Sequence, residues 1–405
     1  MIIKDLKINP LRSFLTAFSM LIGILAVIAA VLVGTVGKGY LQATNEQLFG
    51  RTPALTIDIA GADISHYRFL SAFTARLHKT GDPTALVITP DNDLTYAFPA
   101  TGDDDPGSGS GEKERMWQRQ LLANNVHFDT IYTTTDYNRL YNLPLVEGTW
   151  FHAPTSPTRL EIVLNKAAAS TIGQRSILYA TGENTITLTP FNVVGTVNDG
   201  RDTPTVYVNV VPLARFAPHL FSANSARLLW FNTAHHTPDS VRAYLTDVLT
   251  DVGGAQVEEI HTQNDADNYD GVISMLQLAF FITAALLLFV SALGLINIGL
   301  ASLDQRTHEL LIRRALGATR TSIAWLVLGG ALFLSLIVAV AAIVLSLFLL
   351  VLIGALLPAD SPVSPPSYPY GAALVAVSSS IATAFLGGIV PAIKASRLQP
   401  ALALR

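Results

Sequence analysis

The sequence predicts a membrane protein with four transmembrane α-helices and a large extracytoplasmic α+β domain of two lobes. Half of the 405 residues are hydrophobic and only 14% are charged, whereas a soluble domain carries about a quarter charged residues. The deficit is local, because the apolar residues concentrate in a few long runs. The basic residues gather beside the ends of those runs. We therefore expect several membrane spans attached to one soluble region.

Each apolar run is long enough to cross a bilayer, which takes about 20 residues. The first run exceeds the apolar core of a cleavable signal peptide, so we expect a retained anchor. The third run exceeds one perpendicular crossing, and Gly329-Gly330 is a candidate break that would make it two crossings. We expect the four spans over residues 13–36, 271–303, 322–357 and 370–393, with an outer loop over 358–369.

The charge distribution favours one long third span. Lysine and arginine near span ends mark the cytoplasmic side of a membrane protein. Ten basic and three acidic residues lie before the first span, between the second and third, and after the fourth, a balance of +7; the rest holds sixteen basic and twenty-seven acidic residues, a balance of −11, which gives the net −4. Four spans place every basic island inside, whereas a fifth would place the tail 394–405 outside. We expect a tilted or projecting third helix, both termini in the cytoplasm, and a plasma- or inner-membrane location.

The first residues predict a cytoplasmic interfacial helix over 1–12. Apolar residues alternate there with Lys4 and Lys7, and Arg12 follows just before the first span. Such a segment lies in the membrane interface with its basic side chains toward lipid phosphates. The alternative is an unstructured tail.

Residues 37–270 have the composition of a soluble, extracytoplasmic domain. A β-α-β pattern occurs near each end of this region, and a strand-rich stretch lies between them. We expect one lobe over about 45–100 and 213–265, with a second lobe over about 113–212 inserted into it. The strand patterns fall at 55–60, 85–89, 130–134, 160–164, 185–197, 205–211, 226–232 and 255–260, and the helical patterns at 64–78 and 239–252.

The sequence offers no catalytic, metal or nucleotide motif. The Gly-Ser-rich stretch 101–113 ends in GSGSGEK, but its spacing is not that of a phosphate loop, and Glu114 stands where Ser or Thr is required. The nine histidines are scattered without carboxylates at ligand spacing, and there is no cysteine. The expected spans hold no Asp, Glu, Lys, Arg or His, although ion-coupled transporters usually need such groups. We expect no enzyme activity, cofactor or nucleic-acid partner for this chain, and an energy source outside it.

The most informative stretch is the charged island at 304–321, between the second and third spans. Glu309 and Arg313 are one helical turn apart in the favourable order, and Gly317 after Leu316 indicates a helix C-cap. We expect a short helix that offers a handle to a soluble partner. The alternative is a basic loop that only orients the spans. The expected apolar flank of this helix consists of Leu303, Leu310 and Leu311.

The island resembles the segment that follows the second span in MacB/FtsX-like ABC-transporter permeases. In that family the pattern is approximately (R)-E-I-G-x-x-(R/K)-A-L-G-A-(T/S). His308 stands where Arg is usual and Leu311 where Gly is usual. The C-terminal PAIKASRLQPALALR and the outer segments LYNLPLVEGTWF and NVVGTVND are similar to the family as well. The matching positions of the island are Glu309, Ile312, Arg314, Ala315, Leu316, Gly317, Ala318 and Thr319.

The resemblance implies a mechanotransmitting, type VII-like permease whose coupling helix docks on an ABC ATPase dimer. It also implies ATP and Mg²⁺ in those ATPase subunits, a second permease chain of the same or a homologous kind, and in some members an extracytoplasmic partner. The implied function is export or extraction of an amphiphilic, peptide, lipid or drug-like substrate. Two alternatives are a complex that signals to an extracellular partner such as a cell-wall hydrolase, and a membrane-anchored scaffold outside the ABC class. The implied coupling residues are Glu309, Leu310, Arg313, Arg314, Ala315, Leu316 and Gly317.

The predicted topology can be tested with single cysteines, because the chain has none of its own. We expect Ser108→Cys, in the outer domain, to react with a membrane-impermeant maleimide applied from outside. Thr319→Cys, in the charged island, should react only after the membrane is permeabilised. Labelling of Thr319→Cys from outside intact membranes would contradict the topology.

Overall fold

The computed structural model describes residues 10–98, 119, 121, 125–152, 159–173, 175–182, 187–232, 236–263, 266–358, 360–361 and 368–398. The chain divides into two compact units. The first contains the long apolar helices. The second contains a β-sheet with its helices, and the described residues of the loop after the third span belong to it. Each unit is considered by itself.

Four helices are long and apolar enough to cross a membrane, namely Ala17–Phe49, Gly271–Leu303, Arg320–Leu356 and Tyr370–Ser396. The third apolar run is one uninterrupted helix with Gly329 and Gly330 inside it, so the structure has no break there. The first contains a five-residue π-helical turn. The bounds are α2 Pro10–Leu32, the π turn Val33–Gly37, α3 Lys38–Phe49, α10 Ala266–Ala315, α11 Arg320–Leu356 and α12 Tyr370–Ser396.

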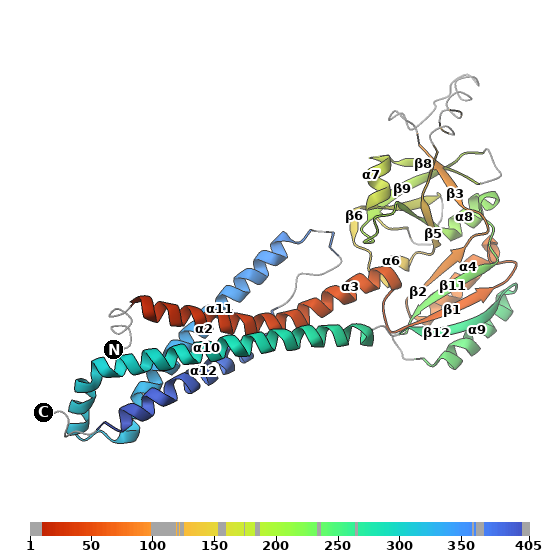
Figure 1. Cartoon of the computed structure of the whole chain (residues 1–405). Coiled ribbons are helices and arrows are strands. Elements are labelled where there is room, and N and C mark those ends of the chain that lie inside the picture. The colour runs from red at the N-terminus through yellow and green to blue at the C-terminus, as the bar shows by residue number, and fades with distance from the viewer. Residues whose placement is uncertain are drawn as a thin grey trace. The chain divides into compact units, whose positions relative to one another are not determined.

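The four spans pack side by side (Figure 1), and side chains of one helix lie closely against glycines of the next. A Cβ atom on Gly23 of α2 would lie 2.8 Å from Leu288 Cδ2 of α10, and one on Gly299 of α10 would lie 2.5 Å from Pro391 Cγ of α12. Small residues permit this approach, which gains van der Waals contact where lipid supplies no hydrophobic drive. The apolar centre of the bundle consists of Met20, Ile24, Ile28, Leu295, Val338, Ala339, Ala342, Ala372 and Ala376.

The first lobe of the outer unit is an antiparallel sheet with strand order β12-β1-β11-β2. Its two β-α-β units interleave, because β11 lies between β1 and β2, and β1 lies between β11 and β12. The apolar residues at helical spacing in α4 and α9 are buried, as the sequence predicts. The elements are β1 Ala54–Ala60, α4 Tyr67–Leu77, the 3-10 turn His78–Thr80, β2 Thr84–Thr89, β11 Ser225–Phe231, α9 Pro238–Val252 and β12 Gln256–Gln263.

The second lobe continues the sheet in the order β5-β10-β7-β9-β8-β3-β4, and β6 pairs with β9. The β5/β10 and β7/β9 pairs are parallel. The elements are β3 Leu94–Ala97, β4 Asn125–His127, β5 Asp129–Thr133, α6 Tyr137–Leu140, β6 Leu145–Gly148, β7 Glu161–Asn165, α7 Lys166–Ile172, β8 Ile177–Gly182, β9 Thr189–Val197, β10 Thr205–Asn209, α8 Val210–Phe216 and the 3-10 turn Pro218–Leu220.

Two details of this lobe differ from the sequence analysis. The strand β3 falls in the range expected for the first lobe, yet it pairs with β8 of the second. Val210 and Val211, expected to end a strand, begin α8 instead. Asn209 causes the change, because its Oδ1 accepts a hydrogen bond from the Val211 N–H at 3.3 Å and caps the helix.

A short ladder joins the two lobes. Strands β2 and β5 share only the pairs Val87↔Thr133 and Ile88↔Tyr132. Two threonine hydroxyls extend the contact. The Leu86 N–H donates to Thr134 Oγ1 at 3.1 Å, and Thr133 Oγ1 donates to the Leu86 carbonyl at 2.9 Å. Side-chain hydrogen bonds therefore continue the contact where the backbone ladder ends.

A buried polar hub stabilises the second lobe around Asp199, which is 1% exposed. Tyr207 Oη donates to Asp199 Oδ2 at 2.8 Å, and Asn165 Nδ2 donates to Oδ1 at 3.2 Å. Burial raises the pKa of Tyr207 well above its usual value, and the nearby Asp199 charge adds to the rise. The tyrosine therefore stays a neutral donor, as a buried carboxylate requires.

The loop after α11 is attached to the second lobe through Asp360. Its Oδ2 lies 2.6 Å from Lys166 Nζ at the start of α7, and its backbone carbonyl accepts a hydrogen bond from Asn198 Nδ2 at 2.8 Å. The hydrogen bond from Lys166 lowers the pKa of Asp360. The carboxylate therefore keeps its charge, and this contact, until the pH falls below the usual range of an aspartate.

Two glycines explain the outer-domain segments that resemble the family. Gly148 ends LYNLPLVEG and Gly195 lies in NVVGTVND, and the two pair across β6 and β9. Gly148 has φ +73°, and a Cβ atom there would clash with the Val194 carbonyl oxygen. A Cβ atom on Gly195 would clash with the Thr149 carbonyl oxygen in the same way. The strands approach too closely for any side chain.

We expect Gly148→Ala to destabilise the protein by about 2–5 kcal/mol, because it adds a backbone clash to the strain of a positive φ. Gly81→Ala is the matched control, since Gly81 has φ +81° but nothing within 4 Å of a new Cβ atom. It should cost only about 1–2 kcal/mol. Thermal unfolding of the detergent-solubilised chain measures both, and equal losses would mean that the β6–β9 contact is not tight.

Candidate functional site

The charged island is the end of α10 and not a separate helix. The helix α10 continues through residue 304 to Ala315, and its last turns bend from the line of the helix (Figure 1). Gly317, at φ +100°, ends it. The Ala318 N–H donates to the Arg313 carbonyl and the Gly317 N–H to the Arg314 carbonyl, both at 3.1 Å. This is the Schellman arrangement, and it confirms the C-cap that the sequence predicts at Gly317.

A second cap follows at once and begins α11. Thr319 Oγ1 accepts a hydrogen bond from the Ser322 N–H at 3.2 Å, and Arg320 is the first residue of the helix. A glycine-ended helix and a threonine-capped helix thus meet within a few residues. The turn is fixed at both ends, so the coupling segment (residues 304–321) has a defined surface.

One side of the coupling segment is buried. Leu303, Leu310 and Leu311 are 5%, 4% and 4% exposed, so the apolar flank predicted from the sequence is confirmed. Leu303 and Leu310 cluster with Ile323 of α11 and Ala395 of α12. Leu310, expected among the residues that contact a partner, therefore holds the three helices together and is not available at the surface.

The opposite side of the coupling segment is exposed and partly apolar. Leu316 is 83% exposed and Ile312 is 47% exposed, at the helical spacing that places them on one face. Large apolar groups that stay exposed side by side and are rimmed by polar residues indicate a binding surface. The exposed face consists of His308, Glu309, Ile312, Ala315 and Leu316. Ile312 was matched as a motif position in the sequence but not chosen as a coupling residue.

The two neighbouring arginines have different contacts. Arg313 Nη2 donates to Glu309 Oε1 at 2.8 Å, and both side chains are more than a third exposed. Such a pair on a helix surface contributes about 0.3–0.5 kcal/mol, so it orients Glu309 more than it stabilises the helix. Arg314 is half-buried and donates from Nη1 to the carbonyls of Ser396 and Leu398, at 2.8 and 2.9 Å. The guanidinium group of Arg314 is therefore held by contacts inside this chain.

The expected interfacial residues are only partly described. Lys4 and Lys7 lie outside the described residues. Arg12 lies in α2, but the structure does not describe its side chain. Their proposed contact with lipid phosphates remains a prediction.

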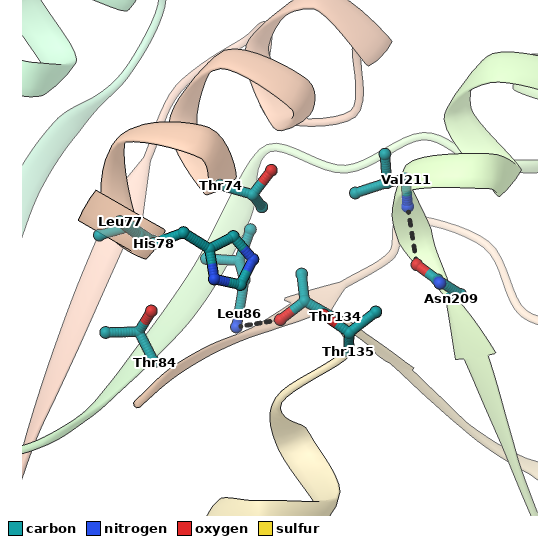
Figure 2. Close-up of a pocket in the computed structure, with 9 residues that line it drawn as sticks. All are labelled: Thr74, Leu77, His78, Thr84, Leu86, Thr134, Thr135, Asn209 and Val211. Carbon is teal, nitrogen blue, oxygen red and sulfur yellow. Dashed lines mark hydrogen bonds between the residues drawn. The ribbon is translucent and has the colours of Figure 1, made fainter. Parts of the chain in front are cut away.

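A second candidate is a small hollow beside the seam between the lobes, about 20 Å³ in volume, which is room for little more than a water molecule. Figure 2 shows the His78 ring turned into it. Thr134 Oγ1 and Asn209 Oδ1 in its wall accept hydrogen bonds from backbone N–H groups. Its polar groups thus serve the local fold. Over the part of the chain that the structure describes, no three His, Asp or Glu side chains are grouped to hold a metal ion.

Family models match both halves of this architecture. A model of the MacB-like periplasmic core domain matches residues 13–248, more than half of the chain, and one of the FtsX-like permease C-terminal region matches residues 281–400. The chain belongs to the MacB/FtsX-like permease family. The coupling segment lies inside the FtsX-like match. The chain is thus a membrane protein with a periplasmic domain, as the sequence predicts.

Named relatives agree with this assignment. The chain is 26% identical to the pyoverdine export ATP-binding/permease protein PvdT of Pseudomonas entomophila and 24% identical to the macrolide export ATP-binding/permease protein MacB of Nitrobacter winogradskyi. Each match covers 98% of this chain but 58% of the relative, so the chain spans little more than half the length of either. A structure of the periplasmic region of MacB from Actinobacillus actinomycetemcomitans matches with a TM-score of 0.33 and 12% identity, over 55% of this chain and 93% of that one.

Proposed function

We propose that this chain is the permease subunit of an ABC exporter, and that a separate ABC ATPase subunit binds its coupling segment. The observation that carries this proposal is the exposed face with Glu309, Ile312 and Leu316, held in place by two helix caps. A carboxylate beside apolar side chains suits a groove that offers arginines or backbone donors. ATP and Mg²⁺ bind in the ATPase, and two permease chains assemble with two ATPase subunits.

The long helices supply the route by which ATPase closure reaches the outside. The helix α10 runs without interruption over 50 residues, from Ala266 to Ala315. A continuous helix transmits displacement because each turn is hydrogen-bonded to the next. The spans carry no ionisable side chain in their apolar runs, which favours ATP over an ion gradient as the energy source. Movement of the coupling segment therefore drives the outer domain.

The substrate class follows from the relatives as a proposal. Two of them are named for export of pyoverdine and of macrolides. We place the substrate of this chain among amphiphilic, peptide, lipid or drug-like molecules, handled outside or at the outer leaflet. In this scheme both termini and the coupling segment lie in the cytoplasm, because basic residues near span ends mark the cytoplasmic side of a membrane protein.

Co-purification with the cognate ABC ATPase tests the proposal. We expect Glu309→Ala to weaken ATPase binding by about 2–5 kcal/mol, since it removes one partner of a desolvated charged contact. Glu258→Ala is the matched control, because Glu258 is an exposed carboxylate on β12 of the outer domain. It should change binding by less than about half a kcal/mol. Equal ATPase yield and ATPase rate for Glu309→Ala and the parent, with both chains folded and inserted, would exclude coupling through this residue.

A further inference from the structure

Arg314 joins two elements that are far apart in the sequence. Its Nη1 donates to the Ser396 and Leu398 carbonyls, 82 and 84 residues away along the chain. Its Nε atom is buried, so water does not reach that side of the guanidinium group. This contact, the Arg314 clamp, ties the end of α10 to the end of α12.

The acceptors explain why a cation lies there. Ser396 is the last residue of α12, and the final carbonyls of a helix have no partner within it. They also carry the partial negative charge of the helix dipole. The Lys394 and Ala395 carbonyls accept from the Arg397 and Leu398 N–H groups within the same segment. The Ser396 carbonyl accepts from Arg314, a charged donor on a different helix, so this part of the cap is present only while α10 stays beside α12.

Close packing also holds α10 and α12 together at positions that precede the Arg314 clamp along both helices. Gly299 of α10 lies against Pro391 of α12. Ala395 is fully buried in the cluster with Leu303 and Leu310, and Leu398 packs on its edge. Arg314 follows Arg313 directly and precedes Ala315 of the exposed face. The clamp therefore lies directly behind the surface that we assign to the ATPase.

We propose that Arg314 is a positioning residue that makes the end of α12 and the coupling segment move as one body. A force on Leu316 and Ile312 then moves α12 together with α10, and both spans respond to the ATPase. The inference rests on the proposed function, but the clamp itself is testable without an ATPase. The two neighbouring arginines thus have different roles, since Arg313 orients Glu309 and Arg314 holds the end of α12.

The test uses the absence of native cysteine. Nitroxide labels at Gln305→Cys, in the last turns of α10 but outside the exposed face, and at Arg397→Cys, both exposed positions, report the distance between the two ends by dipolar electron paramagnetic resonance on the full chain. We expect one narrow distance in the parent. Arg314→Ala should broaden it, with about tenfold or more growth of the undocked population, because hydrogen bonds from a charged donor are lost. Arg314→Lys should recover part of the narrow distribution.

Arg320→Ala is the matched control, because Arg320 is an exposed arginine at the same end of the bundle. It should keep the parental distribution, and thermal unfolding should show that all variants remain folded. Adding the ATPase and a non-hydrolysable ATP analogue should leave the distance unchanged in the parent and shift it in Arg314→Ala. A parental width in Arg314→Ala would overturn the role of Arg314. ATPase binding by the parent is measured separately and decides the proposed function alone.

Discussion

Close packing of side chains against glycines of the neighbouring helix is the constraint on which the membrane unit depends. Lipid tails are as apolar as leucine, so burial alone does not hold spans together. Glycines provide the contact instead, where Gly23 meets Leu288, Gly299 meets Pro391, and Gly387 meets Leu295. Two of these three contacts lie between α10 and α12. They keep the inner ends of these helices in register, and so let Arg314 reach the carbonyls beyond them.

The coupling segment owes its two-sided character to this packing. Leu310 and Leu311 point into the bundle, so Glu309, Ile312 and Leu316 point out. An isolated helix of this length would be marginal in water. As the last turns of a 50-residue helix, it needs no separate nucleation. A partner that binds it therefore pushes on a preformed surface, and little binding free energy is lost in ordering it.

Local patterns in the sequence were sufficient for much of this structure. Apolar run length predicted the spans, helical spacing predicted α4 and α9, and Gly317 predicted the end of α10. The features that the sequence did not predict depend on contacts between residues that are distant in the chain. Pairing of β3 with β8, the attachment of Asp360 to Lys166, and the Arg314 contact with Ser396 have no local signature. Leu310 and Leu316 look alike in the sequence, and only packing separates the buried one from the exposed one.

The central claim is that the exposed face of the coupling segment binds an ABC ATPase. A photo-crosslinking amino acid at Leu316, which is 83% exposed, tests it most directly in intact cells, with the same group at the exposed outer residue Leu145 as the control. We predict that the Leu316 position captures an ABC ATPase subunit and that the Leu145 position does not. Capture at Leu316 of lipid alone, or of a protein without an ATP-binding domain, would contradict the account.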